Sequence, residues 1–206
     1  MSFTNGAASV RPENRVRVTD VRALRALAHP LRLAILNHLM TFGQSTATEC
    51  AAAVGSTGSN CSYHLRSLAR FGLVEQAEST DARERPWRSV ATGLDLGDLA
   101  GGIAGDQDDL AARTLAATLA ERTIDDDAAL ARRYIAGYGA LPTEWQESSQ
   151  LANYGLRATA GELAALRDAV DALIRPYIAL TRADAPADAA VVHVAFNAFP
   201  HPDDVL

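Results

Sequence analysis

The sequence contains two cysteines, no lysine and no long hydrophobic run. Cys50 and Cys61 are too few for a disulfide framework, which argues against a small secreted disulfide scaffold. No stretch of about 18 apolar residues occurs, so we expect no transmembrane helix and no membrane partner. Residues 1–17 are polar and lack the apolar segment of a secretory signal. We therefore expect a cytoplasmic protein, and the hydrophobic content of 48% is sufficient for a core.

The charges are unevenly distributed between the two halves of the chain. Residues 1–94 contain 11 Arg and 7 Asp or Glu, a net charge of +4. Residues 95–206 contain 8 Arg and 18 Asp or Glu, a net charge of −10. Opposite charges in two halves are typical of a nucleic-acid-binding module joined to a domain with a different role.

Four helices are predicted in the N-terminal half, because apolar residues recur there at intervals of three and four. The expected ranges are 20–27, 30–42, 46–54 and 57–70. Pro30 suits the first turn of the second helix, since its missing N–H would have no helical partner there.

The segments that follow the third and fourth helices complete a known motif. Gly55 permits a tight turn, because glycine adopts a positive φ without steric cost. After Gly72 the pattern changes, and residues 73–78 and 87–90 are predicted to be two strands joined by a turn. A series of helices with a tight turn, followed by a hairpin, is the order of a winged helix-turn-helix.

The fourth predicted helix has one apolar and one polar face. Cys61, Leu65 and Leu68 are expected to pack on the preceding helices. The opposite face is small and polar at its start and basic at its end. Short side chains let a helix enter the major groove, hydroxyls and amides reach base edges, and Arg neutralises phosphates. An ordinary amphipathic helix with a solvated face is the alternative, and the arginines of the predicted hairpin favour the DNA interpretation.

Two segments resemble the ArsR-type (ArsR/SmtB-like) winged helix-turn-helix transcriptional regulators. Residues 27–36, LAHPLRLAIL, are similar to the opening of that domain, and residues 62–74, SYHLRSLARFGLV, to its recognition helix and exit. The resemblance covers about residues 20–92. It implies a homodimer that reads partly palindromic double-stranded DNA, usually as a repressor, and it places Ser59, Asn60, Ser62, Tyr63 and His64 in the base-reading stretch.

DNA contacts are predicted from the fourth helix, from the turn before it and from the hairpin. The predicted contact residues are Ser56, Thr57, Ser59, Asn60, Ser62, Tyr63, His64, Arg66, Arg70, Arg83, Arg85 and Arg88. The free N–H groups at the start of the helix suit a phosphate. The side chain of Asn60 suits an adenine edge.

No metal site or cofactor is predicted. The metal-sensing members of the family that the chain resembles carry Cys-x-Cys on the third helix, where this chain reads TATEC over residues 46–50. Cys50 and Cys61 are therefore interpreted as small core residues. A zinc site of both cysteines and a histidine is the alternative. His38 and His64 are expected to be structural histidines rather than metal ligands.

Residues 106–206 are predicted to form an acidic, helical domain after a glycine-rich connection. The aspartates at 125–127 are expected to restart or bend its first helix, and residues 150–156 are expected to pair with a strand at 190–196. Dimerisation and binding of a small-molecule effector both fit this domain, and an alanine-rich stripe over 112–119 favours close helix contact. Five aromatic residues of this domain have two possible roles: they line an effector pocket, or they fill an ordinary core. They are Trp145, Tyr154, Tyr177, Phe196 and Phe199.

The predicted fold is mainly α with little β. A disordered arm over 1–18 precedes a winged helix-turn-helix domain over 19–94, and a helical domain over 106–206 ends with a short strand pair. The predicted function is sequence-specific transcriptional regulation. No enzyme is expected, since the sequence has no Gly-rich phosphate loop, HExxH or Gly-x-Ser-x-Gly. The alternative is a winged helix that contacts proteins and does not bind DNA.

Overall fold

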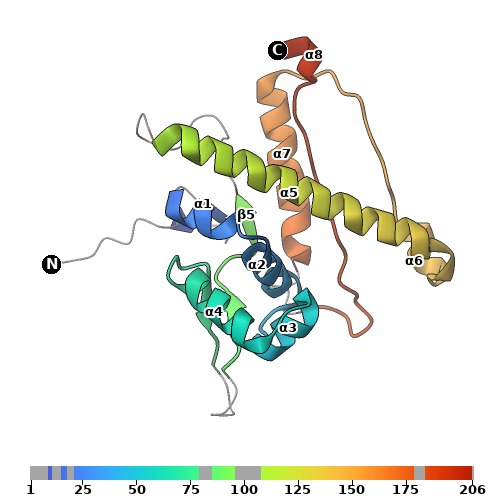
Figure 1. The fold of residues 1–206 in the computed structure, drawn as a ribbon. Helices are drawn as coiled ribbons and strands as arrows, with labels where there is room; N and C mark the ends of the chain where they lie inside the picture. Colours follow the sequence, from blue (N-terminus) through green and yellow to red (C-terminus); the bar gives the residue numbers. More distant parts are fainter. Residues whose placement is uncertain are drawn as a thin grey trace. The chain divides into compact units, whose positions relative to one another are not determined.

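The computed structural model describes residues 9–10, 15–17, 21–78, 85–95, 108–178 and 184–205 (Figure 1). The chain divides into two compact units. The first unit comprises residues 1–121 and 176–191, and the second comprises residues 122–175 and 192–206. Within the described ranges, no helix has the length and apolarity needed to cross a bilayer.

The first unit begins with the four predicted helices. These are α1 (Val21–Leu27), α2 (Pro30–Phe42), α3 (Ala47–Val54) and α4 (Gly58–Ala69). Side chains cap three of them: Nδ1 of His29 accepts the N–H of Leu31 at 3.2 Å on α2, Thr46 and Glu49 form a capping box on α3, and Thr57 caps α4. Such caps satisfy N–H groups that have no partner within the first turn.

The core of the first unit lies between these helices. Its largest fully buried side chains are Leu24, Leu27, Ile35, Leu36, Leu39, Cys50, Leu65, Leu68, Leu73, Val74 and Leu119. Most of them recur at helical spacing, and those of α4 include Leu65 and Leu68 of the inward face that the sequence predicted. Removing one such leucine costs about 2–5 kcal/mol of stability, so the core holds α4 firmly.

The predicted hairpin is confirmed. Strands β3 (Val74–Gln76) and β4 (Trp87–Ser89) pair in antiparallel fashion, with Glu75 opposite Arg88. We call residues 74–89 the wing. Trp87 is 8% exposed, and its backbone forms a bridge with Ser45, just before α3. The wing is therefore anchored to the same core as α4.

A second small sheet was not predicted. Strand β2 (Arg15–Arg17) pairs in parallel with β5 (Gly93–Asp95) and in antiparallel fashion with β1 (Ser9–Val10). The expected disordered arm over 1–18 is therefore wrong for the two strands that the structure describes there, because backbone pairing with β5 orders them. The other residues of that arm lie outside the described ranges.

Helix α5 (Asp108–Gly137) is continuous, so the expected restart at residues 125–127 is wrong. An ion pair one turn apart, from Nε of Arg122 to Oδ1 of Asp126 at 3.2 Å, supports the helix at this point. In the part of α5 that belongs to the first unit, Ala116 is 4% and Leu119 2% exposed, and Leu119 joins the core. The described part of the alanine-rich stripe is therefore covered by the chain's own first unit.

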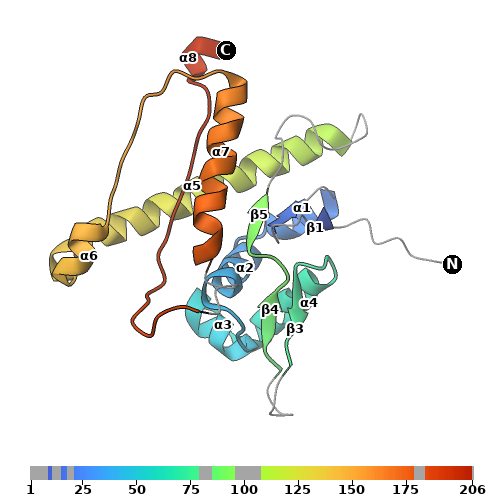
Figure 2. The same cartoon turned by 180° about the vertical axis from the view of Figure 1, so that it is seen from behind.

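The second unit contains the rest of α5, η1 (Tyr138–Ala140), α6 (Thr143–Ser148), α7 (Ala160–Ile174) and α8 (Pro202–Val205). A short η2 (Arg175–Tyr177) follows α7. Thr159 and Glu162 form a capping box at the start of α7. Figure 2 shows thin connections without helix or strand before α7 and before α8. The predicted strand pair of 150–156 with 190–196 is wrong. The structure assigns neither segment to a strand or a sheet.

Candidate nucleic-acid interface

The turn between α3 and α4 is held by local hydrogen bonds. Gly55 ends α3 in the left-handed conformation, with φ of 66°, as predicted. Thr57 caps α4, and its Oγ1 accepts the N–H of Asn60 at 3.3 Å. The side-chain amide of Asn60 donates to Oγ of Ser56 at 3.1 Å. A Cβ on Gly58 would lie 3.5 Å from Oγ1 of Thr48, so α4 starts close against α3.

One face of α4 is anchored in the core. Cys61, Leu65 and Leu68 are each 0% exposed, which confirms the predicted inward face. The anchoring residues occupy successive turns of α4. The rotation of the helix about its axis is therefore fixed, and so is the set of side chains that points to solvent.

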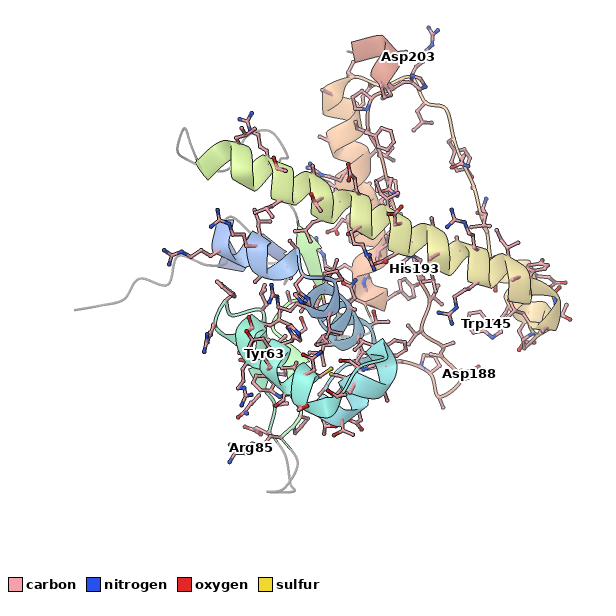
Figure 3. The ribbon with its side chains drawn as sticks, viewed as in Figure 1. Tyr63, Arg85, Trp145, Asp188, His193 and Asp203 are labelled. Atoms are coloured by element: carbon pink, nitrogen blue, oxygen red, sulfur yellow. The ribbon has the colours of Figure 1, made fainter. Side chains whose placement is uncertain are left out.

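The opposite face of α4 is exposed and carries the polar residues that the sequence predicted. Tyr63 is 62% exposed, and Ser59, Asn60, Arg66 and Arg70 are also exposed. Figure 3 shows Tyr63 on α4 and Arg85 near the end of the wing. Arg66 and Arg70 form no ion pair with any residue that the structure describes. Their guanidinium groups are therefore available to phosphates.

The structure contradicts the expectation that His64 reads a base. Its side chain is 5% exposed, and its ring centroid lies 4.6 Å from that of His29. Nδ1 of His64 has no hydrogen-bond partner in the described part of the chain. Burial lowers the pKa of His64, and the neighbouring His29 and Arg32 lower it further. A buried imidazole behind Tyr63 does not reach a DNA groove.

The wing contributes less free positive charge than the sequence suggested. Nε and Nη2 of Arg88 lie 2.8 Å and 2.6 Å from Oε1 of Glu75, so this arginine is paired. The strand register places the two residues opposite each other, and opposed charges on paired strands were the signal that could have predicted the contact. Arg85 is exposed, and Arg83 lies outside the described residues.

The two cysteines are core residues, as predicted. Both are 0% exposed, and burial raises the pKa of the Cys50 thiol to about 11. A raised pKa in apolar surroundings is typical of a structural, unreactive cysteine. Within the described residues, no three His, Cys, Asp or Glu side chains form a group that could hold a metal ion.

The aromatic residues of the acidic half do not form a core. Tyr154 is 76%, Tyr177 68%, Phe196 44% and Phe199 70% exposed. The interpretation of these four as core residues is therefore wrong. Small-molecule sites bury most of the ligand surface, and side chains as exposed as these do not enclose one.

Comparison with known proteins finds one family that matches the segment containing α3 and α4. The family model described as "Helix-turn-helix domain" matches residues 27–77, which include α2, α3, α4 and β3. No curated protein matches the chain significantly. One similar solved structure is the NMR structure of the homodimeric winged helix-turn-helix DNA-binding domain of a possible ArsR-family transcriptional regulator from Mycobacterium bovis. It is 23% identical over 53% of this chain and 79% of that chain, with a TM-score of 0.32. The match to the helix-turn-helix model covers residues 27–77 of the 206 residues.

Proposed function

We propose, from the match of residues 27–77 to the helix-turn-helix domain family, that this protein is a sequence-specific DNA-binding transcriptional regulator. It acts in the cytoplasm as a homodimeric, ArsR-like repressor without the Cys-x-Cys metal site of the metal-sensing members, and it is not an enzyme. The observation that carries the proposal is the exposed polar and basic face of α4, opposite Cys61, Leu65 and Leu68.

The order of side chains along α4 suits insertion into the major groove. Ser59, Asn60 and Tyr63 stand in its first half, where a recognition helix contacts base edges. Arg66 and Arg70 follow one and two turns later, where the helix leaves the groove and meets the phosphates. Ser56 and Thr57 precede the helix, and the N–H groups of its first turn suit a further phosphate.

If the Asn60 side chain turns fully toward a base, its bond to Ser56 breaks. The bond between them is exposed, so breaking it costs about 0.5–1.5 kcal/mol. A bidentate contact of an amide with adenine contributes about 1–3 kcal/mol of discrimination. The balance favours the DNA-bound arrangement, and until DNA arrives the bond to Ser56 keeps the Asn60 side chain ordered.

Direct binding to DNA tests the proposal. The full chain is titrated against labelled duplexes from the region upstream of its own gene, at about 50 mM salt, where phosphate contacts are strongest. We expect one duplex to bind more tightly than a scrambled duplex of equal length. If no duplex binds at this salt concentration, the winged helix is a protein-contact module, an outcome in keeping with the paired Arg88 of the wing.

A further inference from the structure

Three aromatic rings form a continuous row from the exposed face of α4 to the start of α2. The ring of Tyr63 lies edge-on to the imidazole of His64, with 5.2 Å between the centroids and 77° between the planes. The imidazole of His64 in turn lies 4.6 Å from that of His29. Tyr63 is 62% and His64 5% exposed, so the buried imidazole supports the exposed ring from behind. This contact restricts the direction in which the Tyr63 ring points.

The charged groups around His64 are cationic. The guanidinium of Arg32 donates to the backbone carbonyls of Arg25 and Ala26 at the end of α1, which holds its charge in place. Burial lowers the pKa of His64, and the charges of His29 and Arg32 lower it further. No carboxylate is among the described groups that act on His64. A protonated His64 would therefore have no anionic partner in the part of the chain that the structure describes.

Hydrogen bonding also favours neutral rings in this row. Nδ1 of His64 is fully buried and has no partner among the described residues, so a proton on it would be a buried donor without an acceptor. Such a group costs about 1–3 kcal/mol. Nδ1 of His29 accepts the N–H of Leu31, and a protonated imidazole has no acceptor nitrogen. Protonation of His29 would therefore remove the cap of α2.

We propose that His64 positions Tyr63 for contact with DNA and does so only as a neutral imidazole, so that mild acid releases the preferred duplex. A protonated His64 ring gains hydration when it leaves its buried site, and Tyr63 then loses the contact that orients it. His64 is a positioning residue, because it acts through Tyr63 and does not touch DNA itself. The inference rests on the proposed function, since it assigns Tyr63 to the DNA interface.

The direction of the pH effect distinguishes this device from general electrostatics. Protonation of exposed histidines adds positive charge, which strengthens the attraction to phosphates. Acid that acts through net charge alone therefore raises affinity for every duplex. Acid that acts through His64 lowers affinity for the preferred duplex, although Arg66 and Arg70 on the exposed face of α4 remain, because arginine keeps its charge.

Fluorescence anisotropy of the full chain at pH 7.5, 6.5 and 5.5 tests the proposal, with the preferred duplex and a scrambled duplex at constant ionic strength. We expect affinity for the preferred duplex to fall as the pH drops through the lowered pKa of His64. The limit is about tenfold per pH unit, because one proton then competes with binding. Affinity for the scrambled duplex should stay constant or rise. Circular dichroism at each pH monitors the helices.

Two variants of His64 separate positioning of Tyr63 from support of the fold. His64→Phe keeps an aromatic ring behind Tyr63 and removes the titration, so it should bind the preferred duplex equally well at pH 7.5 and 5.5. His64→Ala removes the ring and should reduce the preference for that duplex about three- to tenfold at pH 7.5. This reduction should disappear in the Tyr63→Ala background, because a double-mutant cycle isolates an effect that passes through Tyr63.

The outcomes separate this inference from the proposed function. Three results would overturn the inference and leave the proposed function in place: equal affinity of the wild type for the preferred duplex at pH 7.5 and 5.5, loss of affinity in acid by His64→Phe as in the wild type, or an equal effect of His64→Ala with and without Tyr63. Failure of every duplex to bind at pH 7.5 would overturn both.

Discussion

The imidazole rings of His29 and His64 lie 4.6 Å apart, with an angle of 44° between their planes. His29 caps the start of α2, and His64 lies on the buried side of α4. The contact therefore joins the first turn of one helix to the middle of the helix that we propose enters DNA. Protonation of His64 would place a positive charge beside His29 and Arg32, so we expect the packing of α4 to weaken in acid.

Acid should destabilise the first unit through His64. Burial lowers the pKa of His64 below its ordinary value of 6.5, and the charges of His29 and Arg32 act in the same direction. Burial also lowers the pKa of His38, although Glu49 opposes this shift. The unfolded chain thus binds more protons than the folded chain once the pH falls below about 6.5. The free energy of unfolding should be at its full value above that pH and should decrease as the pH falls through the lowered pKa values.

Urea unfolding at pH 7.5, 6.5 and 5.5, followed by circular dichroism, measures this dependence. His64→Leu should reduce the slope of unfolding free energy against pH, and the remaining slope should reflect His38. An equal slope in His64→Leu and wild type would contradict the role of His64.

Arg66 should contribute to binding of every DNA sequence. It is exposed on α4 and has no ion pair with a described residue, so its charge is free for a phosphate. Arg66→Ala should reduce the slope of log affinity against log salt by about one unit, since one released counterion is lost. Fluorescence anisotropy between 50 and 200 mM salt, a range of about fourfold, measures the slope. Arg167→Ala, on α7, is the control, and a slope unchanged by Arg66→Ala would exclude the phosphate contact.

Asn60 should determine specificity rather than general affinity. Its amide is exposed at the start of α4 and is held by Ser56, so it is oriented before DNA arrives. Asn60→Ala should weaken binding to the preferred duplex by about 1–3 kcal/mol and relax the preference at one base pair. Affinities for single-base variants of that duplex measure the preference. An equal loss on preferred and scrambled duplexes would instead assign Asn60 a structural role in the turn.

The helices of the first unit were predictable because their signals are local. The cap at Thr46, the turn at Gly55 and the apolar spacing of α2 and α4 act within a few residues of where they stand in the chain. The sheet of β1, β2 and β5 was not predictable in this way, since it joins residues 15–17 to residues 93–95. Such a parallel pairing depends on tertiary structure that no short window contains.

For His64, the family resemblance and the helical spacing give different predictions. The resemblance places this residue in the base-reading stretch, whereas the spacing of apolar residues places it on the inward face of the helix. Cys61, His64, Leu65 and Leu68 stand at i, i+3, i+4 and i+7, the spacing of one helix face. The period alone therefore places His64 with the buried residues, where the structure has it. The apolar alternation of residues 190–196 predicted a strand, but the structure has no strand there, because alternation within a short window does not supply a neighbouring strand to pair with.

The pair of Glu75 and Arg88 should limit how strongly the wing binds DNA. Both side chains are about half exposed, so their ion pair adds only about 0–1 kcal/mol to stability, but it neutralises a positive charge at the place where a wing meets the phosphate backbone. Glu75→Gln should release Arg88, raise affinity for all duplexes alike and steepen the salt dependence by about one unit. Glu78→Gln, which removes the same charge from an exposed residue beyond β3, tests whether the change in net charge alone produces the effect. Equal increases in the two variants would show that Arg88 is not the residue released, and no increase in Glu75→Gln would place the wing away from the DNA.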